Sequence, residues 1–416
     1  MTQSENQDSA WHLFEAIGVE LEYMIVDRQS FNVRPLADEL LRDDHGQVVS
    51  DVECGTIAWS NELVAHVVEL KTNGPATDLD PLTQQFQTNI ETINRRLANH
   101  QACLLPTAMH PWMDPNSEMV LWPHECSEIY ATFNRIFDCR GHGWANLQSM
   151  HLNFPFCGDD EFGRLHAAIR LLLPLLPALA ASSPIMDGRP TGRLDNRLEV
   201  YRTNSARIPM VAGRVIPEPV FDRAAYDREI FQPMFQQIAP FDSRGVLQDE
   251  FLNARGAIAR FSRGAIEIRV LDVQECPQAD IAIATLIVEV LKLLVAEHWT
   301  DTADQQSVGV DPLETALLAA INDAEQAVAK SPDVLRHFGV TETSLTLQEL
   351  WQHLLAAATK SAGVQLNDSA ALQTIVHQGP LARRMLQRLP AHPEPGDLHQ
   401  LYAELADCLE HGRLLA

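Results

Sequence analysis

The chain has 416 residues and a formal charge of −25, with 56 acidic against 31 basic side chains. This length allows about two or three domains, and the acidic balance argues against nucleic acid or an anionic membrane as a partner, because both select basic surfaces. It does not exclude ATP, since bound metal ions and arginines can reverse the local sign of the field. The polar first residues, MTQSENQDSA, lack a secretory pattern, so we expect a cytoplasmic protein with a disordered tail over residues 1–12.

The first predicted strand lies in FEAIGVELEYMIVD, where Glu20 and Glu22 alternate with the apolar Val19, Leu21 and Tyr23. The two carboxylates then share one face of the strand. At about 4 Å and an effective dielectric constant of about 20 they would repel by roughly 4 kcal/mol. If this face is covered, we therefore expect a cation against it.

Two further acids, Glu62 and Glu69, follow in SNELVAHVVELKT. Because positions 62 and 69 are an odd number apart, one uninterrupted strand would send their side chains to opposite faces. We place Glu62 in the turn before the strand, with Ser60 and Asn61 as turn residues, and a bulge is the alternative.

The middle of the chain alternates helices and strands. A helix is predicted over about residues 81–103, and in the strand LQSMHLNF the side chains of His151 and Asn153 share a face. The next helix should kink or end at Pro174 and Pro177. Residues 196–219, rich in Arg and Pro, are interpreted as a substrate loop, and residues 222–238 as a helix.

The segment AIARFSRGAIEIRVLD places Glu267 and Arg269 on one face of a strand. Such a pair alone is most often an exposed ion pair. If the four acidic or histidine-bearing strands lie in one sheet, however, five carboxylates and one imidazole line a single surface. An oxygen-rich site of this kind suits Mg²⁺ or Mn²⁺.

Other metal and membrane interpretations are weaker. The seven cysteines are scattered, odd in number and without a C-x-x-C spacing, which indicates reduced thiols rather than a zinc site or disulfide framework. His142 and His151 invite a zinc interpretation, but no second cluster matches them. The apolar run IAIATLIVEVLKLLVAEHW is broken by Glu289 and Lys292, which favours a buried helix over a membrane span.

From residue 279 onward all signals are helical. The apolar stripes of these helices are interpreted as core rather than as a cofactor site. We divide the chain into the tail, a catalytic domain over residues 13–298 and a C-terminal helical region over residues 299–416.

Five segments resemble, in order, the motifs of the glutamate-cysteine ligase family, closest to its bacterial second-type and carboxylate-amine ligase branch: GVELEYMIVD, NELVAHVVELKT, QSMHLNFPF, ALAASSPIMDGRPTGRLDNR and GAIEIRVLDVQECP. The resemblance covers residues 13–298. It implies an α+β fold like the glutamine synthetase catalytic domain, a curved antiparallel sheet with flanking helices, here extended by C-terminal helices. It also implies an ATP-dependent ligase that phosphorylates the side-chain carboxylate of glutamate, or of a related acid, and couples it to an amine such as cysteine, as in glutathione biosynthesis.

Carried over by position, the resemblance implies the metal ligands Glu20, Glu22, Glu62, Glu69, His151 and Glu267. His151 is also expected near the phosphates. The family member most readily compared has an aspartate where Glu62 stands, so the longer arm alters the expected metal distance.

Arginines are expected to hold the transferring phosphoryl group, because a planar guanidinium suits bidentate contact with phosphate. Arg269 is the first catalytic candidate, beside Glu267, and Arg197 is the second, although an ordinary loop arginine is the alternative for Arg197. Arg260 and Arg263 are candidates for contact with the nucleotide phosphates.

Two other functions stay open. One is an ATP- and metal-dependent phosphotransfer to a guanidino or amine group on the same sheet, and the other is a non-catalytic sensor of an amino acid or nucleotide. The intact acid set argues against the sensor, because adjacent carboxylates repel when no metal is bound. The sequence leaves open the amine acceptor and whether the chain forms a homo-oligomer.

Overall fold

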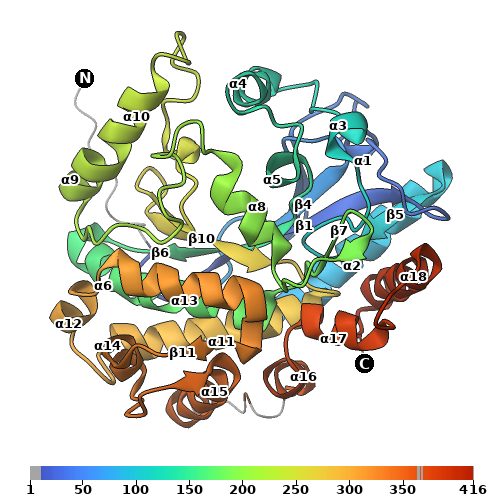
Figure 1. The fold of residues 1–416 in the computed structure, drawn as a ribbon. Helices are drawn as coiled ribbons and strands as arrows, with labels where there is room; N and C mark the ends of the chain where they lie inside the picture. Colours follow the sequence, from blue (N-terminus) through green and yellow to red (C-terminus); the bar gives the residue numbers. More distant parts are fainter. Residues whose placement is uncertain (1–10, 363–365, 367–368, 416) are drawn as a thin grey trace.

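The computed structural model describes residues 11–362, 366 and 369–415. Most of the predicted N-terminal tail, residues 1–10, lies outside the described residues. The centre of the described fold is an eight-stranded sheet in which every recorded strand pair is antiparallel (Figure 1). The predicted α+β fold with an antiparallel sheet and flanking helices is therefore confirmed.

The strands of this sheet run in the order β2-β3-β4-β1-β6-β10-β9, and β5 also pairs with β1. Their bounds are β1 Gly18–Asp27, β2 Asp51–Cys54, β3 Ile57–Asn61, β4 Val67–Thr72, β5 Ala102–Leu105, β6 Ser149–Pro155, β9 Ala257–Arg260 and β10 Ala265–Asp272. Two small sheets pair β7 Ile185–Met186 with β8 Arg189–Pro190, and β11 Val328–Ala329 with β12 Leu345–Thr346. These last two strands interrupt the wholly helical C-terminal region expected from the sequence.

The helices are α1 Ala37–Leu40, α2 Leu82–Leu97, α3 Pro115–Glu118, α4 Ser127–Phe137, α5 His142–Ala145, α6 Gly158–Leu172, α7 Pro177–Ala180, α8 Asn196–Asn204, α9 Arg223–Tyr226, α10 Gln232–Ile238, α11 Pro277–Val295, α12 Thr302–Gln306, α13 Val310–Asp323, α14 Pro332–Leu335, α15 Leu347–Ala362, α16 Ala370–Gln378, α17 Leu381–Arg388 and α18 Pro395–His411. In the described part of the chain, no helix is both long and apolar enough to cross a membrane.

The two faces of the sheet differ. Val19, Leu21 and Tyr23 are fully buried in the core on one face, where α6 and α11 pack. Over the opposite face lie α4, α5 and α8, as Figure 1 shows above the strands. The strand alternation in β1 thus separates an apolar face from a polar one, as predicted.

The register brings the predicted side chains together. Glu22 pairs with Glu69 across β1 and β4, and Glu20 pairs with His151 across β1 and β6. Glu267 of β10 pairs with Asn153 of β6. The polar residues of these neighbouring strands therefore form one continuous row.

Several boundaries differ from the sequence predictions. The helix expected to end near residue 103 gives way after Leu97 to a short 3₁₀ turn and then to β5, so Cys103 lies in a strand. The expected substrate loop begins as α8, because the side chain of Asp195 caps that helix by accepting from the amide of Leu198 at 2.8 Å. Ser60 and Asn61 are the last residues of β3 rather than turn residues.

The helices beyond residue 298 contribute to the same apolar core as the sheet. Leu317 of α13 and Trp351 of α15 belong to the cluster that contains Val19 and Leu21. Helix α18 packs on β5 and α2. The division at residue 298 stays a prediction.

Candidate active site

Glu20 lies at the centre of the polar row. Its carboxylate accepts a hydrogen bond from Nδ2 of Asn153 at 2.9 Å, and its other oxygen lies 2.9 Å from Nδ1 of His151. Gly18 permits this arrangement, because a Cβ there would stand 3.1 Å from Cβ of Asn153. The start of β1 is therefore shaped around the side chains that hold Glu20.

Glu22 is held by a residue that the sequence analysis did not single out. The amide and hydroxyl of Ser149 donate to its carboxylate at 2.7 and 2.9 Å. The same hydroxyl lies 2.9 Å from Nε2 of His151, so one serine connects the acid to the imidazole. Ser149 begins β6, two residues before His151, which is the only signal that could have pointed to it.

The side chains that contact Glu69 come from β3 and from β4 itself. The hydroxyl of Ser60 donates to it at 2.6 Å, and Nζ of Lys71 lies 3.4 Å from it. Lys71 also binds Asp51 at 2.6 Å. Glu62 lies between β3 and β4, outside any strand, so the prediction of a connecting segment rather than one continuous strand is confirmed.

These side chains fit a divalent metal ion. Glu20, Glu69 and His151 form one group whose ligand atoms all lie within 4.8 Å of one another, and Glu22, Glu62 and Glu69 form another. The donors are carboxylate oxygens and one imidazole, the set that Mg²⁺ and Mn²⁺ accept. Glu69 belongs to both groups, so it would contribute a ligand to an ion held by either of them.

The electrostatics of the row support this fit. Burial, followed by repulsion from neighbouring carboxylates, raises the pKa of Glu69 to about 7 and the pKa of Glu62 well above its usual value. Burial likewise raises the pKa values of Glu20 and Glu22. Burial and then Arg269 lower the pKa of His151, a shift in the direction of the neutral imidazole that binds metals.

Glu267 differs from the other acids because two arginines face it. Nε of Arg260 lies 2.9 Å and Nη1 of Arg269 lies 3.4 Å from its oxygens. Burial alone would raise its pKa, but the attraction of Arg269, Arg260 and His151 outweighs burial and lowers the pKa to about 2. Glu267 therefore stays ionised at any ordinary pH.

Arg197 is almost fully buried beneath Arg269. Its guanidinium donates to the carbonyl oxygen of Arg269 at 2.8 Å and to Asp272 at 3.3 Å. Asp272 also accepts from the amide of Ser182 and the hydroxyl of Ser183, at 2.8 and 2.9 Å. The Ser182-Ser183 pair that follows α7 thus anchors the end of β10 and Arg197 together.

Cavities flank the row on either side. One, of about 560 Å³, is lined by Glu22, Arg197, Tyr201 and Arg269. Another, of about 750 Å³, is lined by Gly18, Glu20, Asn153 and Glu267. Both are bordered by the same six residues, which include the predicted phosphate-binding arginines: Glu62, Glu69, Lys71, Tyr130, Arg260 and Arg263. The two cavities therefore adjoin each other over part of the acid row.

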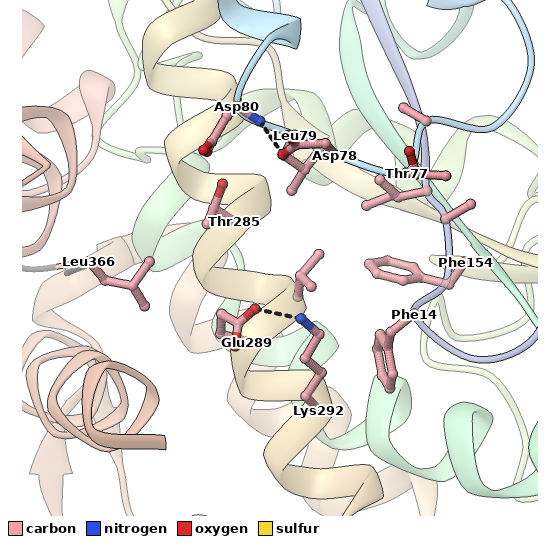
Figure 2. Close-up of a pocket in the computed structure, with 14 residues that line it drawn as sticks. Phe14, Thr77, Asp78, Leu79, Asp80, Phe154, Thr285, Glu289, Lys292 and Leu366 are labelled. Atoms are coloured by element: carbon pink, nitrogen blue, oxygen red, sulfur yellow. Dashed lines mark hydrogen bonds and ion pairs between the residues drawn. The ribbon is translucent and has the colours of Figure 1, made fainter. Parts of the chain in front are cut away.

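A third cavity, of about 240 Å³, lies on the face of the sheet where α11 packs. Figure 2 shows that Phe14 and Phe154 face its interior and that Lys292 of α11 is held by Glu289, at 2.7 Å. It contains none of the predicted site residues and is separate from the acid row.

The residues considered for zinc or cysteine chemistry lie elsewhere. Nε2 of His142 lies 3.1 Å from Asp187, and among the described residues His142 joins no group with metal-binding geometry. The seven cysteines are all free. The buried thiols of Cys103 and Cys139 have pKa values raised by burial, which makes them poor nucleophiles.

Comparison of the sequence with known proteins identifies the family of this chain. The model of glutamate-cysteine ligase family 2 matches residues 16–414, and the chain belongs to this family. An uncharacterized protein of Archaeoglobus fulgidus is 30% identical over 398 residues, covering 96% of this chain and 99% of that protein. A putative glutamate–cysteine ligase 2-1 of Nocardioides sp. is 28% identical over 294 residues, covering 68% of this chain and 69% of that protein.

Among solved structures, glutamate–cysteine ligase from Francisella tularensis in complex with AMP superposes with a TM-score of 0.64 at 14% identity. The match covers 97% of this chain and 90% of that one. The two proteins therefore share a fold along nearly their whole length.

Proposed function

We propose that this protein is an ATP-dependent carboxylate–amine ligase that activates the side-chain carboxylate of glutamate as an acyl phosphate. The observation that carries the proposal is the buried acid row between two cavities that share Arg260 and Arg263. In the proposed reaction a phosphoryl group passes from a nucleotide in one of these adjoining cavities to an acid in the other. Membership of the glutamate-cysteine ligase family and the fold shared with an AMP-bound ligase support the same function.

The larger cavity is assigned to ATP. It is lined by Gly18, Gly74 and Gly264, at which the backbone can approach a phosphate closely. The cavity of about 560 Å³, which is lined by Arg197, Arg269 and Tyr201, is assigned to the acid and the amine. Guanidinium groups there suit the carboxylates of an amino acid.

The reaction proceeds in two displacements. An oxygen of the glutamate side-chain carboxylate attacks the γ-phosphorus of ATP and ADP leaves. The amine nitrogen then attacks the acyl carbon, phosphate leaves with that oxygen, and the nitrogen loses a proton. The cavity is lined by carboxylates and arginines that can position both substrates, so we assign the step to direct transfer between them.

The residues of the row have positional and electrostatic tasks. Glu20, Glu22, Glu62, Glu69 and His151 would hold Mg²⁺ or Mn²⁺, and Glu267 is proposed to complete that set. Such ions, when bound, offset the charge that builds up on the phosphoryl group. Arg269 is proposed to contact the transferring group, and Arg197 to fix the backbone of Arg269 through the 2.8 Å hydrogen bond.

The test follows an oxygen atom. Glutamate labelled with oxygen-18 in its side-chain carboxylate is incubated with ATP, Mg²⁺ and hydroxylamine, a small nucleophile that traps acyl phosphates as hydroxamates. We expect label in inorganic phosphate and formation of ADP and the hydroxamate. Label in AMP would indicate adenylation instead, and a phosphorylated amine without label transfer would indicate a phosphotransferase.

A further inference from the structure

The cavity assigned to the acid and amine has two unlike walls. One wall is the acid row described above. Its opposite wall is apolar and comes from α4, from α5 with the residues after it, and from the 3₁₀ turn Glu250–Leu252. The side chains of this apolar wall are Ile129, Phe133, Trp144, Leu147 and Phe251, each of them half-buried.

The apolar wall is held in place by its own contacts. The ring of Phe133 lies 5.5 Å from that of Trp144 and 6.4 Å from that of Phe251. The indole nitrogen of Trp144 donates to the carbonyl oxygen of Asn204 in α8 at 3.0 Å, which fixes the ring. These residues also border the main core, so the wall is preformed.

A small polar acceptor would leave the apolar side chains of this wall exposed to water. Glutamate and cysteine are both short and polar, and together they would cover little of an aromatic surface in a cavity of about 560 Å³. Displacing water from apolar surface is favourable in proportion to the area covered. An acceptor with an apolar body would therefore bind through the wall while its nitrogen reaches the row.

We propose that the acceptor is a primary amine that carries an apolar or aromatic body about as large as a phenyl ring, with the body seated on the apolar wall. This specificity rests on the ligase function proposed above. Arg197 and Arg269 are assigned to glutamate, and the apolar wall determines which amine is joined to that glutamate.

The experiment compares straight-chain primary amines, from methylamine to hexylamine, with phenethylamine, cysteine and hydroxylamine. Because the alkylamines have nearly the same basicity, differences in kcat/KM report the contact of the chain. We expect kcat/KM to rise roughly three- to fourfold for each added methylene group, and phenethylamine to exceed methylamine by about 100-fold or more.

The outcomes separate the two proposals. If no amine and no hydroxylamine gives product, the ligase function is wrong. If hydroxamate forms but chain length has no effect, or cysteine exceeds every apolar amine, the ligase function stands and the apolar acceptor is wrong.

Variants locate the effect on the wall. Phe133→Ala should lower the ratio of kcat/KM for phenethylamine to that for methylamine at least tenfold. Phe137→Leu is the matched control, since Phe137 packs 5.4 Å from Trp144 but does not line the cavity, and it should leave that ratio unchanged. If Phe133→Ala does not fold, Phe251→Leu takes its place, and an unchanged ratio in the variant that folds would overturn the proposal.

Discussion

Glu267 and Glu69 occupy the same face of one sheet but have opposite electrostatic surroundings. Two arginines hold Glu267 ionised, with a pKa of about 2. Glu69 has one lysine at 3.4 Å, and burial, followed by repulsion from Glu20, raises its pKa to about 7. The first acid is neutralised by the protein, whereas the second requires a further cation to stay ionised at neutral pH.

Glu22→Gln should abolish Mg²⁺-dependent ADP formation without lowering the melting temperature. The amide keeps the volume of the side chain and one acceptor for Ser149, and it removes a like charge from a crowded, buried face. Thermal unfolding and ADP release are measured on the same preparation. Glu289→Gln, on the opposite side of the sheet, serves as control and should keep full activity; normal turnover in Glu22→Gln would remove this residue from the proposed metal site.

Arg269→Lys should lower kcat and kcat/KM together, on the order of 10²-fold, with little change in the KM for ATP. Lysine keeps the charge but loses the planar fork that can hold phosphate oxygens and Glu267 at once. Arg202→Lys is the matched control, because Arg202 pairs with Glu199 in α8 but does not line the cavity. Near-normal turnover in Arg269→Lys would reduce its role to neutralising Glu267.

Strand alternation was sufficient to predict that Glu20 and Glu22 share one face and that Glu267 and Arg269 share one, because that periodicity is local. The partners of the acids were not predictable in this way. Ser149 meets Glu22 and Ser60 meets Glu69 only because β6 and β3 pair in a particular register with their neighbours. Register depends on contacts between distant segments, which a single sequence does not display.

At the scale of elements, α8 shows how a local cue can be missed. The Arg- and Pro-rich composition of residues 196–219 suggested a loop, yet Asp195 caps a helix that runs through Arg197 to Asn204. The helix turns Arg197 inward onto Asp272 of β10. Helical placement gives this arginine a fixed position against β10, which a loop would not.

Helix α6 carries a buried histidine that makes stability depend on pH. Nδ1 of His166 lies 2.8 Å from the carbonyl oxygen of Val220, and burial, followed by the nearby Arg170, lowers its pKa to about 3. In the unfolded chain the imidazole takes up a proton near pH 6.5, whereas in the folded chain it stays neutral until about pH 3. The histidine's contribution is therefore fully present above pH 6.5 and is lost as the pH falls.

His166→Asn should accordingly flatten the pH dependence of the free energy of unfolding between pH 6 and 4.5. We expect the slope of wild type to exceed that of the variant by about 1.4 kcal/mol per pH unit. Urea unfolding at several pH values gives both slopes. Phe162→Leu disturbs the ring stacked 5.2 Å from His166 without removing a titrating group, so it should keep the wild-type slope; equal slopes in wild type and His166→Asn would contradict the prediction.

At the scale of the whole molecule, the C-terminal helices are joined to the sheet through a buried ion pair. Nη1 of Arg384, in α17, lies 2.7 Å from Glu275 and donates to the carbonyl oxygen of Leu415 at 2.7 Å. Glu275 is fully buried between β10 and α11. One arginine thus ties Leu415 to the segment between β10 and α11, a contact that was not predicted from the sequence.

This ion pair is incompletely satisfied, since Oε2 of Glu275 and both Nε and Nη2 of Arg384 are buried without a hydrogen-bond partner among the residues that the structure describes. Arg384→Ala should destabilise the fold by about 3–5 kcal/mol, because it leaves a buried carboxylate without compensation. The double variant Glu275→Leu/Arg384→Met should recover most of that loss, because apolar side chains of similar volume remove both desolvated charges. Chemical unfolding of the two variants, with the exposed Arg413→Ala as control, measures the effect; a double variant no more stable than Arg384→Ala would show that the ion pair itself, rather than the volume it fills, holds the C-terminal helices to the sheet.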